Sequence, residues 1–206
     1  MQSKQHWETV YSTKPTDGVS WFQEHAEQSL RLIKATDVPN SAHVIDVGGG
    51  ASTLVDDLLA EGYTAATVLD LSGAALEKAK ARLGDKAQKV RWLEGDITQV
   101  ELPRLAFDVW HDRAVFHFLT ESKDRQAYVA QVLRSVKQGG HVIVATFAED
   151  GPLQCSGLPV ARYSPEELHA EFGEPFELIE HQREEHQTPF GTKQQFIYCY
   201  CRKLPS

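Results

Sequence analysis

One stretch of the sequence determines the fold of this chain: Val44-Ile45-Asp46-Val47-Gly48-Gly49-Gly50-Ala51-Ser52-Thr53. A short apolar segment ends with an acidic residue, three glycines follow, and an apolar pattern at helical spacing resumes at Leu54. This order predicts a strand, a tight turn and a helix. Glycine allows a ligand to approach the backbone, and the start of a helix offers free N–H groups. We therefore expect a ligand cradle at the C-terminal end of a first parallel strand.

The same alternation of strand and helix continues along the chain. Strands are expected at residues 66–70, 90–93, 107–111 and 141–147, and helices at 22–33, 52–61, 73–83 and about 128–136. Two further β-rich runs, 176–187 and 194–202, are joined by a turn. Alternation predicts parallel strands with helices on both faces. The expected fold is α/β: a doubly wound, mostly parallel seven-stranded sheet with an antiparallel last strand.

Acidic residues follow several of these strands at the point where each strand ends. Asp46, Asp70 and Asp96 close or follow the first three strands, and His111-Asp112 closes the fourth. The carboxyl ends of parallel strands meet at one edge of a sheet, where ligands bind in such folds. We expect these side chains to form one site.

Composition narrows the class of protein. The 206 residues carry a net charge of −8, which argues against a nucleic-acid partner, since such proteins normally present a basic face. No apolar run is long enough to span a membrane, and the N-terminal residues lack the apolar segment of a signal peptide. Three cysteines without a C-x-x-C pair fit reduced thiols. We expect a cytoplasmic protein.

The chain is expected to form a single domain, residues 1–206, with three parts. Residues 1–40 form an aromatic arm and a helix that act as a cap, residues 41–147 a cofactor-binding core, and residues 148–206 a substrate-side loop, helix and closing hairpin. The arm carries Trp7, Tyr11 and Trp21. Two interpretations of these aromatic residues stay open: they fasten the arm to the core, or they close over a ligand as a lid.

On these motifs the chain resembles the class I S-adenosylmethionine-dependent methyltransferases. The resemblance covers residues 42–147, and the closing hairpin is similar to the last two strands of that family. Five segments carry it: Val44–Gly50, Val68–Ser72, Gly95–Ile97, Phe107–His111 and Leu133–Gly140. The sequence departs from the family pattern at Gly49, where cysteine is more usual, and at Gln138, where proline is common.

The resemblance implies S-adenosylmethionine as the cofactor and S-adenosylhomocysteine as its product. It implies that Asp70 binds the ribose diol, that Asp96 and the Ile97 N–H bind adenine, and that Asp46 favours the amino group. The cofactor-binding residues implied are Trp21, Asp46, Gly48, Gly49, Gly50, Asp70, Leu71, Asp96, Ile97 and His111.

Methyl transfer from a sulfonium is an in-line displacement that needs alignment more than acid catalysis. Holding two reactants in line supplies roughly 7–11 kcal/mol of the barrier. A base is needed only for a protonated nucleophile, and the candidate catalytic residues are His111, Asp112 and His117. For Asp112, pairing with Arg113 is the favoured interpretation. The histidines lack metal-ligand spacing, so no metal is expected.

The methyl acceptor is expected to be a small molecule, with a thiol as one candidate, and the enzyme to fall in EC 2.1.1. Its pocket would be lined by Trp7, Tyr11, Phe116 and Phe147, together with Trp21 and Phe118. One alternative is a protein lysine methyltransferase, because the N-terminal aromatic segment resembles that of a lysine-methylating branch of the same superfamily. A second alternative is a non-catalytic cofactor-binding module that acts as an interaction partner. A third is an NAD-dependent dehydrogenase, which is disfavoured because Thr53 replaces the third glycine of the dinucleotide-binding pattern.

Overall fold

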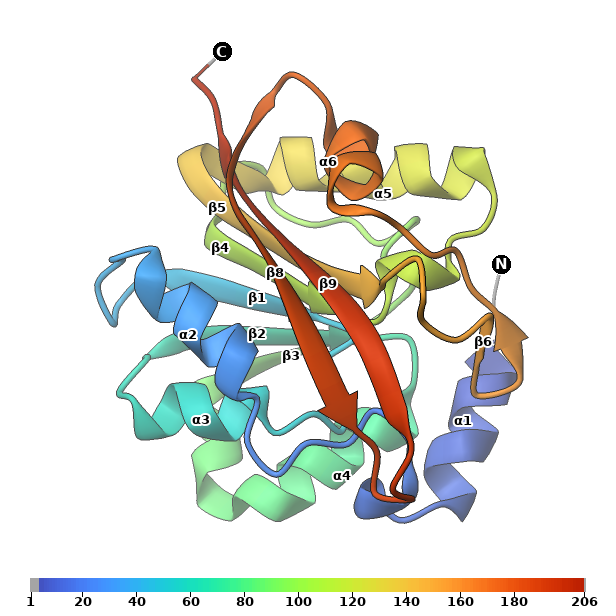
Figure 1. The fold of residues 1–206 in the computed structure, drawn as a ribbon. Helices are drawn as coiled ribbons and strands as arrows, with labels where there is room; N and C mark the ends of the chain where they lie inside the picture. Colours follow the sequence, from blue (N-terminus) through green and yellow to red (C-terminus); the bar gives the residue numbers. More distant parts are fainter. Residues whose placement is uncertain (1–3, 206) are drawn as a thin grey trace.

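The computed structural model describes residues 4–205 as a central sheet with helices on both faces (Figure 1). The helices are α1 (Lys4–Thr13), α2 (Glu27–Ala35), α3 (Leu54–Ala60), α4 (Gly73–Leu83), α5 (Ser122–Ser135) and α6 (Pro165–Phe172), with short 3₁₀ turns at Thr16–Gly18, Gly84–Lys89 and Phe116–Phe118. The strands are β1 (His43–Val47), β2 (Ala65–Asp70), β3 (Val90–Glu94), β4 (Phe107–Arg113), β5 (Val136–Phe147), β6 (Gln154–Cys155), β7 (Leu158–Pro159), β8 (Phe176–Gln187) and β9 (Lys193–Lys203).

Seven strands form the main sheet in the order β3-β2-β1-β4-β5-β9-β8. β1 pairs in parallel with both β2 and β4, and β4 pairs in parallel with β5. β9 is antiparallel to both of its neighbours. The predicted doubly wound sheet with an antiparallel last strand is confirmed. The chain order reverses between β1 and β4, and a crevice for ligands opens at such a point.

Side chains alternate along the strands and bury both faces of the sheet. One face packs Ile45 and Trp110 with residues of α5 and α6, such as Tyr128 and Phe172. The other packs Val44 and the neighbouring strand residues with α2 and α3, and with inward-facing residues of β9. Burial on both faces explains why apolar residues follow one another in β1, at Val44 and Ile45, and in β5, from Val142 to Ala145, instead of alternating with polar ones.

Several elements differ from the expectations: α2 begins at Glu27 rather than at residue 22, and α5 begins at Ser122 rather than at about residue 128. The N-terminal arm contains a complete helix, α1, which lies beyond the ends of the parallel strands (Figure 1). β5 begins at Val136, directly after α5, and includes Gly139 and Gly140, which were expected to lie before the strand. Its pairing with β4 continues through these glycines with a register shift next to Phe107. The expected loop 148–162 folds into the short β6–β7 hairpin. The Ser164 capping box at the start of α6 forms as its sequence predicts.

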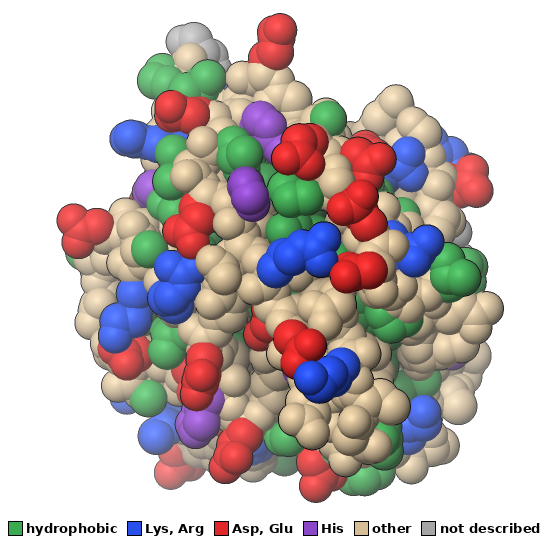
Figure 2. Space-filling model, in the orientation of Figure 1, with side chains coloured by type: hydrophobic (Ala, Val, Ile, Leu, Met, Phe, Trp, Pro, Cys, Tyr) green, Lys and Arg blue, Asp and Glu red, His purple; other side chains and the backbone are tan. Residues whose placement is uncertain are grey.

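The face over β8 and β9 carries interspersed acidic and basic side chains (Figure 2). Surface ion pairs there include Arg31 with Glu180 and Arg183 with Asp150. Among residues 4–205, no helix has the length and apolar character needed to cross a membrane. The predicted division of the chain into residues 1–40, 41–147 and 148–206 stays a prediction. Its two ends, residues 1–3 and 206, lie outside the described residues.

Candidate functional site

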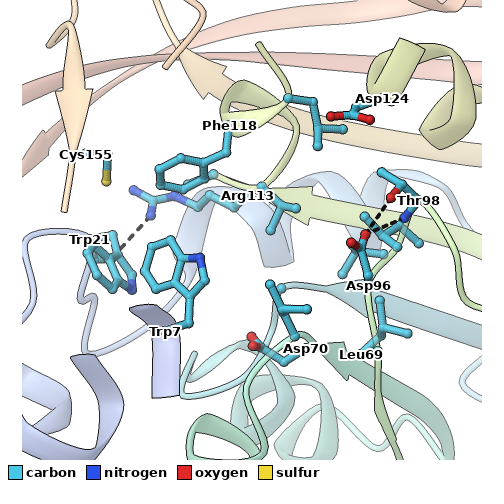
Figure 3. Close-up of a pocket in the computed structure, with 18 of the residues that line it drawn as sticks. Trp7, Trp21, Leu69, Asp70, Asp96, Thr98, Arg113, Phe118, Asp124 and Cys155 are labelled. Atoms are coloured by element: carbon cyan, nitrogen blue, oxygen red, sulfur yellow. Dashed lines mark hydrogen bonds between the residues drawn. The ribbon is translucent and has the colours of Figure 1, made fainter. Parts of the chain in front are cut away.

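The larger of two cavities opens at the C-terminal ends of β1, β2 and β4. It contains about 920 Å³ of space not filled by atoms, including its open mouth. Its lining comes from α1, the segment before α2, the strand ends, the turn after β4 and the β6 hairpin (Figure 3). The lining residues used below are Trp7, Tyr11, Trp21, Gly48, Asp70, Leu71, Asp96, Ile97, Arg113, Val115, Phe118, Asp124 and Cys155.

The smaller cavity lies beside it and contains about 560 Å³ of such space. Asp46, Gly49 and His111 line it, as do Ser52 and Thr53 at the start of α3. Both cavities share Tyr11, Trp21, Gly48 and Arg113 as lining residues. One ligand with a bulky end and a slender tail would therefore fit across the two.

The glycine turn forms the floor between the cavities because side chains do not fit there. Gly48 has a φ of 71°, and a Cβ atom on it would lie 2.0 Å from Cγ2 of Val115. A Cβ atom on Gly49 would lie 2.3 Å from Oδ2 of Asp46. A Cβ atom on Gly50 would lie 2.3 Å from Oδ2 of Asp70 and 2.6 Å from the Cβ atom of Ala75. Two acids thus approach the bare backbone closely.

Asp70 lies at the end of β2 with its carboxylate in the larger cavity (Figure 3). Its Oδ1 atom accepts a hydrogen bond of 2.8 Å from the Ser72 N–H. Burial raises the pKa of this carboxyl to about 7, although backbone hydrogen bonds from Ser72 and Gly50 act in the opposite direction. A buried acceptor that faces a cavity at the point where the strand order reverses suits a ligand with hydroxyl groups.

Asp46 and His111 form a buried pair at the ends of β1 and β4, adjacent partners in the parallel ladder. His111 Nδ1–H donates to Asp46 Oδ1 at 2.7 Å. When Nδ1–H of neutral His111 donates to Asp46, the Nε2 atom is an acceptor, and neither that atom nor Asp46 Oδ2 has a hydrogen-bond partner. Two buried acceptors beside the smaller cavity require a donor, such as an ammonium group.

Asp96 turns the chain at the far end of the larger cavity (Figure 3). Its Oδ1 atom accepts hydrogen bonds from the N–H and the hydroxyl of Thr98, at 2.9 and 2.7 Å. These bonds fix the carboxylate and leave Oδ2 available. The adjacent Ile97 is buried and lines the same cavity, as does Asp124 of α5.

Arg113 separates the two cavities and is held by three elements. Its guanidinium donates to Tyr198 Oη, to the Trp21 carbonyl and to Glu184 Oε2, at 3.1, 3.3 and 3.1 Å. It also lies 4.2 Å from the ring centre of Phe196. The predicted pairing of Arg113 with Asp112 is wrong, because adjacent residues of a strand point to opposite faces of the sheet.

Asp112 faces the layer formed by α5, away from both cavities. Tyr128 Oη donates to its Oδ2 at 2.6 Å, and the N–H groups of Val115 and Phe116 donate at 2.9 and 3.1 Å. Burial raises the pKa of Asp112 to about 7, opposed by these donors. These contacts fix the turn after β4. Asp112 lines neither cavity, so it does not contact a ligand bound there.

His117 is likewise enclosed in the core. Its Nδ1 atom accepts a 3.3 Å hydrogen bond from the Phe147 N–H, and burial lowers its pKa to about 3. Phe116 packs with Tyr128 and Phe172, and Phe147 packs with Phe196. His117, Phe116 and Phe147 line neither cavity. The structure therefore does not bring them to the candidate site, since Phe116 and His117 of the short 3₁₀ turn and Phe147 at the end of β5 are all fully buried.

Phe118 takes the place at the cavity that Phe116 was expected to fill. It packs edge-on against Trp7 with 5.2 Å between ring centres, and Trp7 lies 5.7 Å from Trp21 (Figure 3). Tyr11 completes this aromatic end, 6.3 Å from Trp21. Cys155 of β6 lies beside it, and burial raises the pKa of its thiol to about 12.

The site also contains residues that sequence patterns did not single out. Thr98 and Asp124 line the larger cavity, and Glu184 of β8 pairs with Arg113 across 71 residues of sequence. No local pattern connects β8 with the end of β4, so this pair had no signal in the sequence. Within the described range 4–205, no group of three or more His, Cys, Asp or Glu residues is placed to hold a metal ion.

The fold and this site define a class: doubly wound α/β proteins that hold a nucleoside-bearing ligand over a glycine turn. Residues 44–140 match the family model described as a methyltransferase domain. With the strand order above, this match identifies residues 44–140 as a methyltransferase domain with the fold of the class I S-adenosylmethionine-dependent methyltransferases. S-adenosylmethionine is accordingly its cofactor.

Two curated relatives differ in the acceptor that their names state. The human EEF1A lysine methyltransferase 2 is 22% identical over 192 residues, which cover 86% of this chain and 75% of the relative. The malonyl-[acyl-carrier protein] O-methyltransferase of Anoxybacillus flavithermus is 31% identical over 108 residues, covering 52% of this chain and 39% of the relative. These names leave the acceptor of the present chain open.

Two solved structures share the fold. One concerns the conversion of a disulfide bond into a thioacetal group during echinomycin biosynthesis; it has a TM-score of 0.79 at 17% identity and covers 98% of this chain and 92% of its own. The other is a SAM-dependent methyltransferase from Methanosarcina mazei, with a TM-score of 0.71 at 17% identity, covering 84% of this chain and 98% of its own. At these identities the likeness shows the fold alone.

Proposed function

We propose that this protein transfers the methyl group of S-adenosylmethionine to a small nucleophile that enters at the aromatic end of the larger cavity. One observation carries the proposal: two adjacent cavities with four lining residues in common bring together Asp70 and Asp96, the bare glycine turn, the unpartnered acceptors of Asp46 and His111, and the aromatic end. The bound cofactor supplies a methyl group on a sulfonium, which is an excellent leaving group.

The residues of the crevice fit that cofactor by their chemistry. Asp70 accepts from the ribose hydroxyls, and Asp96 Oδ2 with the Ile97 N–H binds the adenine edge. Asp46 Oδ2 and His111 Nε2 accept from the amino group of the methionine tail, which satisfies both buried atoms. Trp21, Gly48, Gly49 and Leu71 line the path between, and Gly50 acts from behind by leaving room for Asp70.

At the aromatic end the protein orients the acceptor and excludes water. No histidine within residues 4–205 lines the larger cavity, although the His6 ring packs edge-on against Trp7 and the His117 ring edge-on against Phe118, and burial raises the pKa of both Tyr11 and Cys155. The nucleophile therefore has to arrive in its reactive form, as a neutral amine or a thiolate. His111, bound to Asp46, positions the cofactor in this proposal, and the expected base role of His117 has no support in its enclosed position.

A protein amine is the second candidate acceptor. The observation in its favour is the similarity to the human EEF1A lysine methyltransferase 2 over 86% of this chain. A thiol stays a candidate among small molecules.

The test combines calorimetry with a product assay. S-adenosylmethionine is expected to bind and NAD is not; the opposite result would refute the cofactor assignment. Purified protein is then supplied with labelled cofactor and either a panel of thiols, amines and carboxylates or total cell protein. Turnover of a small acceptor supports the proposal. Labelled protein bands without small-acceptor turnover would establish the second candidate in its place.

The affinity for S-adenosylmethionine is expected to rise by about tenfold between pH 6 and pH 8. The raised pKa of Asp70, about 7, leaves its carboxyl largely protonated at pH 6, whereas the ribose hydroxyls bind best to the ionised acceptor. Binding then releases a proton, so the affinity increases as the pH rises through 7. Calorimetry on Asp70→Asn is expected to show affinity lower by about 1–3 kcal/mol and a flat pH profile apart from the titration of the ligand. The same slope in both proteins would assign the titration to another group.

His111→Ala is expected to weaken S-adenosylmethionine binding by about 1–3 kcal/mol, because it removes one acceptor and leaves the Asp46 carboxylate without its partner. His117→Asn serves as the matched control, since its amide oxygen still accepts from the Phe147 N–H. Calorimetry should show nearly wild-type affinity for the control. Equal losses in the two variants would contradict the separate roles.

A further inference from the structure

The first turn of α4 has an unusual set of partners for its backbone N–H groups. The first N–H groups of a helix lack partners within the helix. Here the Ser72 N–H donates to Asp70 Oδ1 and the Ala75 N–H to the Ser72 hydroxyl, at 2.8 and 3.2 Å. The N–H groups of Gly73 and Ala74 donate to the two carboxylate oxygens of Glu8, at 2.7 and 3.3 Å. Side chains thus satisfy four successive N–H groups.

Glu8 belongs to α1, about 65 residues away in the sequence. A carboxylate at a helix N-terminus is stabilised by the N–H groups and by the helix dipole. Two further contacts hold α1 on the same side: Lys4 pairs with Glu94 at the end of β3, and Lys78 of α4 donates to the carbonyl of Lys14. Because both lysine contacts are largely exposed, the two hydrogen bonds of Glu8 are the stronger link between α1 and α4, while His6 of α1 also contacts Ser156 of the β6–β7 turn at 3.4 Å.

The neighbouring face of α1 borders the larger cavity. Trp7 and Tyr11 are buried, line the larger cavity and belong to the aromatic cluster that also contains Val19 and Ala75. In Figure 3, Trp7 and Asp70 border the same space from different elements. The position of α1 therefore determines whether the cavity is covered.

We propose that Glu8 is a positioning residue that holds α1 closed over the cofactor cavity by capping α4. Asp70 and Glu8 bind successive N–H groups of one turn, so the ribose site and the cover over it share the same stretch of backbone. In the ligand-free protein, α1 already covers the cavity in which a cofactor would bind Asp70. Loss of Glu8 leaves Asp70 in place but loosens the attachment of α1. The cofactor part of this inference rests on the proposed function.

The test compares Glu8→Ala and Glu8→Gln with Glu77→Ala. Glu77 is a matched control because it is an exposed glutamate of α4 whose partner, Lys80, is in the same helix. The first measurement is amide hydrogen exchange in the ligand-free protein. Glu8→Ala is expected to speed exchange in α1 roughly 3- to 30-fold, the factor that corresponds to the loss of a helix cap, while β1 and β4 keep wild-type rates. Glu8→Gln should lie between, since its amide oxygen accepts one of the two hydrogen bonds.

The second measurement is the dissociation constant for S-adenosylmethionine. Glu8→Ala is expected to raise it by a similar factor, through faster dissociation, and Glu77→Ala to leave it unchanged. Wild-type exchange in α1 of Glu8→Ala would overturn the inference, as would faster exchange spread evenly over the sheet, which indicates general destabilisation. If the wild-type protein does not bind S-adenosylmethionine, the cofactor assignment fails, and the ligand-free exchange data still decide the role of Glu8.

Discussion

Gly50→Ala is expected to reduce the affinity for S-adenosylmethionine by about 100-fold or more and to destabilise the fold by about 2–4 kcal/mol. The added Cβ atom would lie 2.3 Å from Asp70 Oδ2 and 2.6 Å from the Cβ atom of Ala75. Ala75 is fully buried in α4 and cannot withdraw, so Asp70 has to give way and lose its hydrogen bond to Ser72. Overpacking of a closed site typically costs about 1–3 kcal/mol, and the displaced acid adds to this.

The control for this prediction is Gly84→Ala. Gly84 has a φ of 57°, but a Cβ atom there would have nothing within 4 Å. Gly84 also has a ψ of −131°, a backbone region almost restricted to glycine, so its substitution should cost about 1–3 kcal/mol of strain and should leave the affinity intact. Denaturant unfolding and calorimetry measure the two effects. Wild-type affinity in a folded Gly50→Ala protein would show that the close approach of Asp70 to the turn is not needed for binding.

Asp112→Ala is expected to lower the free energy of unfolding by about 3–4 kcal/mol. The variant leaves the Tyr128 hydroxyl and the N–H groups of Val115 and Phe116 without their acceptor in a buried region. Tyr128 also accepts from the Trp110 indole, so a connected network loses its centre. Urea unfolding measures the loss, with the exposed Asp85→Ala as a control that should change stability by less than about 0.5 kcal/mol.

The result separates a structural role from the catalytic role that the sequence pattern suggested. A catalytic Asp112 would leave the unfolding midpoint near that of the wild type and abolish turnover. A structural Asp112 lowers the midpoint, and Tyr128→Phe should then give a smaller loss of about 1–2 kcal/mol, because it removes the hydroxyl but keeps the carboxylate and its backbone donors.

The order of strands and helices could be predicted because local patterns carry it. The apolar runs at β1 and β2, the glycine turn after β1 and the capping box of α6 depend on neighbouring residues alone. The boundaries of β5 were not predictable in this way. Pairing with β4 keeps the Gly139–Gly140 segment in the sheet, whereas glycines at this point of a sequence usually end a helix.

The acids at the strand ends were predictable as a group, and the residues after β4 were not. Parallel strands bring Asp46, Asp70 and Asp96 to one edge whatever the details of packing. Which of His111, Asp112 and His117 faces a ligand depends on the pleat of β4 and the tight turn that follows. A shift of one residue moves a side chain from the cavity to the core, and no spacing rule resolves that shift.

The sequence by itself determined the doubly wound sheet, the glycine turn and the set of acids at its edge, because hydrophobic periodicity and glycine placement act over a few residues. Only the tertiary structure decided that Arg113 pairs with Glu184 and that Glu8 caps α4. These contacts join residues 65 or more positions apart, and their partners are selected by packing of the whole chain rather than by any local pattern.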